Sequence, residues 1–171
     1  EARGTHVIPF DHTVFFLVRK TDLDKYPQLL KGFGDYDVNF LEFQNDNRKG
    51  DMVAHNPDVV FDAALAYCAT WKALVNFVAY DTALSDVGLR CLQDVPYLLN
   101  LEITNTRCTA AAFKNLKNFP NLANAGIGAM KDGKTLLPAL SKSKILHTIN
   151  MSKLDLTDKD VIPFANVKTL V

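Results

Sequence analysis

The sequence predicts an α/β solenoid, in which parallel strands line a concave face, short helices form a convex face and an amino-terminal cap covers the first unit. Two observations predict this fold. Leucine recurs every 24 residues, at Leu74, Leu98, Leu122, Leu146 and Leu170. Each unit also alternates apolar residues like a strand and then spaces them like a helix. Because one strand and one short helix cannot bury their apolar sides alone, the units are expected to stack around one core.

The strand of each unit is clearest after Leu98. Leu101 and Ile103 alternate with Glu102, which indicates a strand with Glu102 on the face away from the core. The helix that follows is indicated by apolar residues three positions apart. Examples are Leu89, Leu92 and Val95, and then Phe113, Leu116 and Phe119.

Ser85-Asp86 and Thr157-Asp158 stand where the helices of two units begin, and their side-chain oxygens can cap free backbone N–H groups there. Pro96 and Pro120 follow two helices and are expected to end them.

We predict that residues 1–49 form an amino-terminal cap of strand, helix and strand. Residues 50–171 are predicted to form the 24-residue repeats. In the cap we expect a strand over Thr13–Arg19, a helix from Thr21 to Gly32 or Gly34, and a strand over Val38–Phe43.

The polar stretch Gln44–Pro57 breaks the register and predicts an exposed loop or an irregular first unit. A helix is expected to follow over Asp58–Trp71.

The segments Ser85–Leu89 and Thr157–Val161 share the pattern Ser/Thr-Asp-x-x-apolar at the start of a helix. With the 24-residue leucine register, this pattern resembles leucine-rich repeat proteins, and more closely their ribonuclease-inhibitor-like and cysteine-containing classes. In size and layout the chain is also similar to the coupling factor B (subunit s) family of mitochondrial ATP synthase. That similarity implies an accessory subunit of a larger assembly.

Composition narrows the classes of function. Hydrophobic residues make up 48% of the 171 residues and charged residues 22%, which favours one packed domain over a disordered chain. The formal net charge is 0, which disfavours a nucleic-acid partner. The longest strongly apolar run, Val14–Val18, is too short to span a membrane.

The three cysteines indicate the cellular compartment of the protein. Cys68 and Cys108 replace core leucines in the repeat, whereas Cys91 is expected on the outer surface of a helix. An odd count with two core cysteines predicts an intracellular protein, with an organelle such as the mitochondrion as one setting.

We expect a non-catalytic protein-binding or scaffold function, exerted through strand residues that alternate away from the core. These predicted concave-face residues are Asn76, Val78, Asn100, Glu102, Asn124, Gly126, Thr148 and Asn150. The three asparagines form one column, which fits a structural ladder and a partner surface equally well.

A second partner surface is expected at the carboxyl end, where the chain stops after the first two positions of a further unit. Phe164 and Val167 would then lack a neighbouring helix to cover them. The residues of this surface are Leu156, Val161, Phe164, Val167 and Leu170.

Gly128–Thr135 fits the phosphate-binding pattern Gly-x4-Gly-Lys-Ser/Thr, and it lies between a predicted strand and a predicted helix. An alternative function is therefore nucleotide binding through Gly128, Gly133, Lys134 and Thr135. The repeat itself, however, already explains the strand–turn–helix context, and no later strand ends in an Asp placed to hold Mg²⁺.

No other pattern indicates a reaction, so we expect no enzyme activity, cofactor or metal. His6, His12, His55 and His147 show no metal-ligand spacing, and the sequence contains no Cys-x-x-Cys. The sequon Asn150-Met151-Ser152 leaves an extracellular recognition module as a further alternative. Its place inside a predicted strand favours a chance match.

Overall fold

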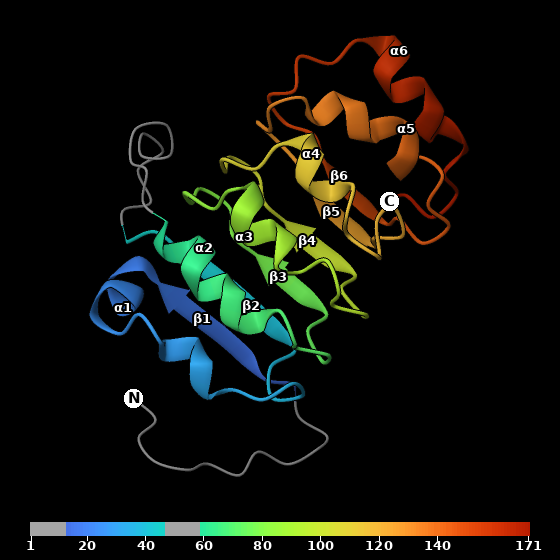
Figure 1. The fold of residues 1–171 in the computed structure, drawn as a ribbon. Coiled ribbons are helices and arrows are strands. Elements are labelled where there is room, and N and C mark those ends of the chain that lie inside the picture. Colours follow the sequence, from blue (N-terminus) through green and yellow to red (C-terminus); the bar gives the residue numbers. More distant parts are fainter. Residues whose placement is uncertain (1–12, 47–58) are drawn as a thin grey trace.

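The computed structural model describes residues 13–46 and 59–171. Within them it is an α/β structure with a six-stranded, all-parallel sheet, and the strands lie side by side in chain order (Figure 1). The strands are β1 (Phe15–Arg19), β2 (Phe40–Gln44), β3 (Asn76–Val78), β4 (Asn100–Glu102), β5 (Asn124–Gly126) and β6 (Thr148–Asn150). The predicted irregular residues 1–10 and most of the predicted loop Gln44–Pro57 lie outside the described residues.

The strand register confirms the 24-residue spacing from β3 onwards. Asn76 pairs with Asn100, Asn100 with Asn124, and Asn124 with Thr148. Phe40 pairs with Asn76, so β2 joins the same sheet through a longer connection. This arrangement of strand and helix in register is compatible with a stack of repeated units.

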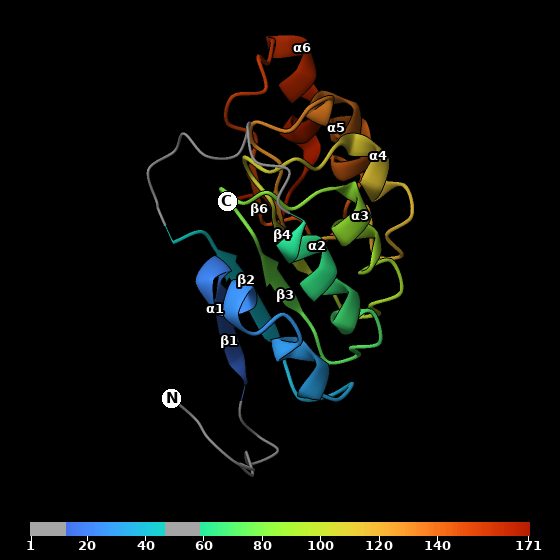
Figure 2. The ribbon, with the colours of Figure 1, turned by 60° about the vertical axis from the view of Figure 1, so that its left-hand side comes forward.

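Short helices follow the strands and lie in a row on one face of the sheet (Figures 1 and 2). The α-helices are α1 (Lys20–Lys25), α2 (Val60–Leu65), α3 (Asp86–Arg90), α4 (Ala110–Phe113), α5 (Leu137–Leu140) and α6 (Asp158–Val161). The 3-10 helices are η1 (Leu29–Gly32), η2 (Ala66–Cys68), η3 (Gly133–Leu136) and η4 (Ile162–Asn166). None of the helices in the described segments has the length and apolar character needed to cross a bilayer.

The prediction of one helix from Thr21 to Gly32 or Gly34 is wrong. Helix α1 already begins at Lys20 and ends at Lys25, and η1 forms separately after Pro27. A proline disfavours helical dihedral angles in the residue before it, here Tyr26, which explains the break. The helix expected over Asp58–Trp71 is likewise two short pieces, α2 and η2.

The predicted helix caps are confirmed. The Ser85 hydroxyl accepts a hydrogen bond from the Val87 N–H at 3.2 Å. Thr157 forms a capping box with Asp160, whose carboxylate accepts the Thr157 N–H at 2.7 Å. Such caps satisfy N–H groups that have no partner inside the helix.

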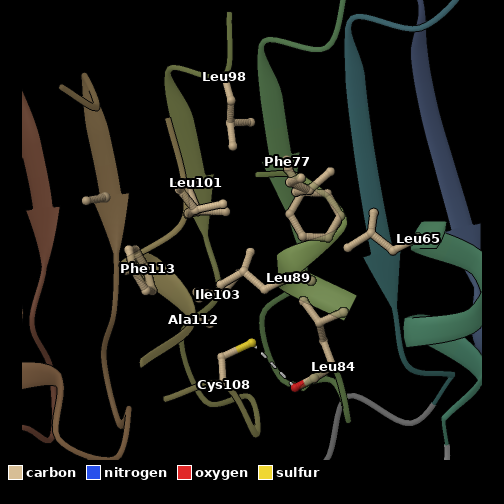
Figure 3. Packing of buried hydrophobic residues seen from close by; sticks show 14 of the residues in the cluster. Leu65, Phe77, Leu84, Leu89, Leu98, Leu101, Ile103, Cys108, Ala112 and Phe113 are labelled. Carbon is tan, nitrogen blue, oxygen red and sulfur yellow. Dashed lines mark hydrogen bonds between the residues drawn. The ribbon is translucent and has the colours of Figure 1, made fainter. Parts of the chain in front are cut away.

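The core lies between the sheet and the helices, and the repeated apolar positions fill it (Figure 3). Leu98 and Leu101 of the β4 unit are at most 2% exposed, and Phe113 of α4 is fully buried. Cys108 confirms its predicted core position, and its thiol lies 3.7 Å from the carbonyl oxygen of Leu84 (Figure 3). Burial of these side chains supplies the main favourable free energy of folding.

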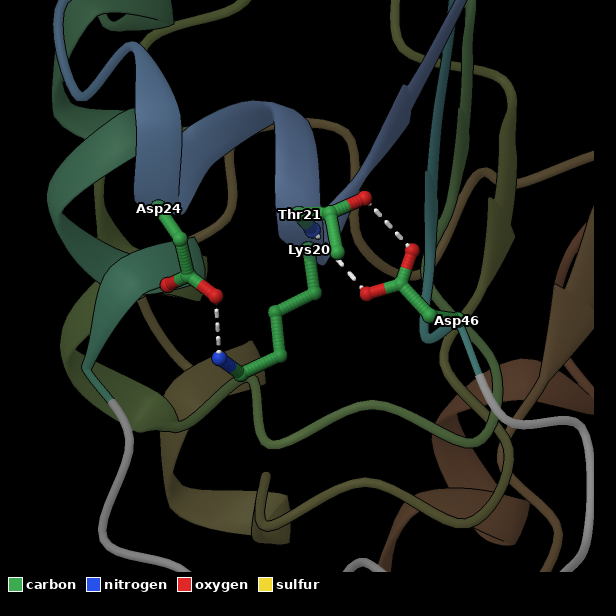
Figure 4. A network of polar contacts seen from close by, with 4 residues as sticks. All are labelled: Lys20, Thr21, Asp24 and Asp46. Atoms are coloured by element: carbon green, nitrogen blue, oxygen red, sulfur yellow. Dashed lines mark hydrogen bonds and ion pairs between the residues drawn. The ribbon is translucent and has the colours of Figure 1, made fainter.

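Carboxylates also connect consecutive units, which the sequence did not predict. Asp62 accepts hydrogen bonds from the backbone N–H and the hydroxyl of Ser85, one unit later in the chain. Asp46 holds the N–H and the hydroxyl of Thr21 in the same way, at 3.0 and 2.8 Å (Figure 4). The Ser85 side chain therefore binds a neighbouring unit as well as its own helix, and Thr21 at the start of α1 also binds a neighbouring unit.

Candidate functional site

The open face of the sheet, meaning the face opposite the helices, carries the predicted concave-face residues. Alternation along β3 places Phe77 in the core and leaves Asn76 and Val78 half-exposed on the open face. All eight predicted residues line one pocket of about 150 Å³. Its lining is Phe40, Asn76, Val78, Asn100, Leu101, Glu102, Asn124, Ala125, Gly126, Thr148 and Asn150.

The asparagine column forms a hydrogen-bonded ladder across four strands. The Asn100 amide N–H donates to the side-chain oxygen of Asn76, and the Asn124 amide donates to Asn100. The Thr148 hydroxyl donates to Asn124 and ends the ladder. Each amide has two N–H groups and an oxygen with two lone pairs, so these three bonds leave donors and acceptors for a ligand.

Gly126, which lines the pocket, and the nearby Gly128 leave room for side chains of neighbouring strands and loops. A methyl group at Gly126 would coincide with the carboxylate of Glu102, which therefore lies across β5. Gly128 lies between Thr104 and Asn150, and the Asn150 amide donates to the Thr104 hydroxyl at 3.1 Å. The side chains of Thr104, just after β4, and Asn150 of β6 thus meet beside Gly128, which has no side chain of its own.

Sequence reasoning missed Phe40, which extends the open face toward β1. The rings of Phe15 and Phe40 lie 4.5 Å apart between centroids, and Phe15 is 51% exposed. The signal was present, because the predicted core positions Leu41 and Phe43 place Phe40 and Glu42 on the opposite face of the same strand.

A second, more open hollow of about 520 Å³ lies beside Tyr26 and Pro27. It is lined by Lys25, Tyr26, Pro27, Gln28 and Leu29 and contains none of the predicted site residues.

The carboxyl-end residues are exposed to different degrees. Phe164 is only 7% exposed and belongs to the buried core cluster, so the expectation that this ring lacks cover is wrong. Val161 is 38% exposed and Ile162 is 64% exposed. Leu156, Val167 and Leu170 are half-buried against the core.

The stretch Gly128–Thr135 follows β5 and leads into η3, yet its polar groups already have partners. The Gly128 N–H donates to the Thr104 hydroxyl, and the Ala129 N–H donates to the Ser152 carbonyl at 2.7 Å. Lys134 donates to the Asp155 carbonyl, and its ammonium group lies 3.8 Å from the Asp160 carboxylate. A phosphate-binding loop instead needs several N–H groups that point at the ligand.

Few groups elsewhere suggest chemistry. Residues 13–46 and 59–171 contain no cluster of three or more His, Cys, Asp or Glu side chains placed to hold a metal ion. His147 is exposed and its Nδ1 lies 3.0 Å from the Thr169 carbonyl, whereas His6, His12 and His55 lie outside the described residues.

The surroundings of the three cysteines make their thiols unreactive. Burial raises the pKa of Cys68 above its usual range and that of Cys108 to about 12, and it also raises the pKa of the half-buried Cys91. A raised pKa keeps each thiol protonated and therefore weakly nucleophilic at neutral pH.

Comparison with protein-family models and with curated proteins finds no match to this chain.

Proposed function

We propose that this chain is a leucine-rich repeat module that binds a protein partner through the open face of its sheet, without catalysing a reaction. One observation carries the proposal: the eight residues that alternate away from the core gather in a single pocket on the sheet face opposite the helices of the described residues. Parallel sheets are normally covered on both faces. A polar, half-exposed open face is therefore suited to binding a partner protein.

The chemistry of the open face suits a protein. The amide ladder offers uncharged hydrogen-bonding groups, and Phe15, Phe40 and Val78 offer apolar surface beside it. Protein interfaces combine such aromatic contacts with a polar periphery. The groups with displaced pKa values in the described residues are Cys68, Cys91, Cys108, Asp94 and Asp160, and none of them lines the pocket.

The repeat assignment rests on sequence and register together. The 24-residue leucine spacing coincides with strand pairing from β3 to β6, and the leucines at the strand starts are buried. We extend the proposal to an intracellular accessory subunit of a larger assembly, in keeping with the buried thiols of Cys68 and Cys108. The paired N–H groups of Gly128 and Ala129 disfavour nucleotide binding.

Site-directed crosslinking tests the proposal. A photoreactive amino acid replaces Asn124 on the open face or, as a control, Gln93 on the helix side, and crosslinked proteins from the native source are identified by mass spectrometry. A protein crosslinked at position 124 but not at position 93 is then purified, and its affinity for the untagged chain is measured.

The double variant Asn100→Arg/Glu102→Arg is expected to lose most of that affinity while remaining folded. The matched control Gln93→Arg/Asp94→Arg makes the same change of charge on exposed helix-side residues and should bind as the wild type does. Equal binding by a folded open-face double variant would remove the open face as the interface.

A further inference from the structure

Glu102 is the charged residue that lines the open-face pocket. Its carboxylate is unusual because it lies over the neighbouring strand. Because Gly126 has no side chain, the Glu102 carboxylate lies over β5 instead of pointing straight out to solvent. One of its oxygens accepts the Thr104 N–H at 2.9 Å, which fixes the carboxylate in place. Held in this way, the carboxylate keeps capacity for further hydrogen bonds, because each ionised carboxylate has about four acceptor sites.

No cation balances this carboxylate in the described part of the chain. Its hydrogen-bond donor is a backbone N–H, and the ion pairs of the described residues all lie elsewhere. Glu42, two strands away on β2, accepts a hydrogen bond from Gln44 and is also without a cationic partner there. Between β2 and β6 the described strand residues of the open face include two carboxylates and no Lys, Arg or His.

The neighbouring groups suit the main chain of an extended segment. The ladder amides of Asn76, Asn100 and Asn124 retain donors and acceptors that can pair with peptide N–H and C=O groups. Beyond the ladder, Phe40 and the exposed Phe15 form an apolar surface. A partner that crosses the strands would meet this apolar surface first and the Glu102 carboxylate next.

We infer that the pocket binds a Lys or Arg side chain of the partner protein, with the cation on Glu102 and the adjacent main chain on the amide ladder. The inference rests on the proposed function, since it names the partner chemistry of the same face. A fixed, partly desolvated carboxylate attracts a cation more strongly than a mobile surface carboxylate does. The charge of the face is complementary to such a segment and repels an acidic one.

The strand spacing sets the sequence pattern of the segment. The Glu102 carboxylate lies over β5, three strands away from Phe40, roughly 14 Å across the sheet. An extended chain covers this distance in about four residues, and side chains four positions apart point to the same side. The partner segment therefore carries an apolar residue about four positions from its Lys or Arg.

A peptide selection tests this. A random library of displayed peptides is selected on the wild-type protein, and peptides that also bind Asn100→Arg/Glu102→Arg are discarded. The remaining peptides are synthesised, each with its Arg replaced by neutral citrulline or its Lys by norleucine. Affinities are measured for the wild type, for Glu102→Gln and for Asp94→Asn, which removes one negative charge far from the pocket.

The expected result is a basic residue with an apolar residue about four positions away, and about a tenfold loss of affinity on neutralising either the peptide cation or Glu102. The two changes together should cost no more than either one alone, which indicates direct pairing. Asp94→Asn should leave the affinity unchanged.

Three outcomes would overturn the inference: selected peptides without basic residues, full affinity of the citrulline and norleucine peptides, or no peptide that depends on the open face. In each case the crosslinking experiment still decides independently whether a protein binds this face.

Discussion

The Asp86 carboxylate of α3 holds Thr109, the residue that caps the next unit's helix α4, by two hydrogen bonds. One comes from the Thr109 N–H at 2.6 Å and the other from its hydroxyl at 2.7 Å. Asp62 holds Ser85 in the same way one unit earlier. Where the next carboxylate is missing, at Ala110, its hydroxyl partner is also missing, at Gly133. At the following step Thr157 keeps the hydroxyl, but Lys134 stands where the carboxylate would be, and Thr157 donates to Asp160 of its own unit instead.

Removal of this link should destabilise the stack. We expect Thr109→Ala to lower the free energy of unfolding by about 1–2 kcal/mol, because the helix loses its cap and Asp86 loses a donor. Thr109→Ser keeps the hydroxyl and should cost much less. Urea unfolding followed by the fluorescence of Trp71, the single and buried tryptophan, measures both values. Equal stability of the Ala and Ser variants would show that the link contributes nothing.

Neighbouring leucines test the strand register. Leu101 is 1% exposed and Leu99 is 37% exposed. Leu101→Ala should cost about 2–5 kcal/mol, because it empties a buried site, whereas Leu99→Ala should change stability by about 0.5 kcal/mol or less. Similar urea midpoints for the two variants would contradict the proposed packing.

Replacing alanine by glycine should affect the stability of the protein differently at two positions. Ala129 has a φ of 55°, in the left-handed region that glycine adopts without strain. Ala129→Gly should therefore stabilise the protein or leave it unchanged, within about 1 kcal/mol. Ala111→Gly, on the exposed side of α4, should destabilise it by up to about 1 kcal/mol. Thermal unfolding compares the two, and a lower midpoint for Ala129→Gly would argue against the left-handed backbone there.

Asp160 should titrate below its ordinary pKa of 3.8, because the backbone N–H and the hydroxyl of Thr157 donate to its ionised form. A depressed pKa in the folded state means stability that is present above the ordinary value and lost as pH falls through the folded value. Thr157→Ala removes one donor and should raise this pKa, whereas Lys134→Ala should raise it less, since Lys134 is the smaller influence. Carboxyl NMR titration measures each midpoint, and a larger effect from Lys134→Ala would reverse this order.

The sequence predicted the repeated part of the fold well because leucine spacing reports burial directly. Leu74, Leu98, Leu122 and Leu146 are all buried, and the alternate residues Asn100 and Glu102 lie on the other face as expected. Helix length was less predictable. Leu92 and Val95 are buried at helical spacing, yet α3 ends at Arg90, because buried turns satisfy the same pattern.

The arrangement of the candidate site could be predicted only in part. Strand alternation placed Asn76, Asn100 and Asn124 in one column, but not the direction of their hydrogen bonds. The position of Glu102 depends on the absence of a side chain on the adjacent strand, at Gly126. Such an effect between two strands appears only when their register is known, because neither residue alone indicates it.

The order of the strands in the sheet has a consequence for how the molecule opens. Each strand pairs with the strands before and after it in the chain, so cooperativity passes from unit to unit instead of through distant contacts. Amide hydrogen exchange should therefore vary gradually along the sheet, with the slowest exchange around β3 and β4, the two central strands, which lie farthest from both edges. A destabilising substitution such as Leu101→Ala should accelerate amide hydrogen exchange most in its own unit and progressively less in units farther away.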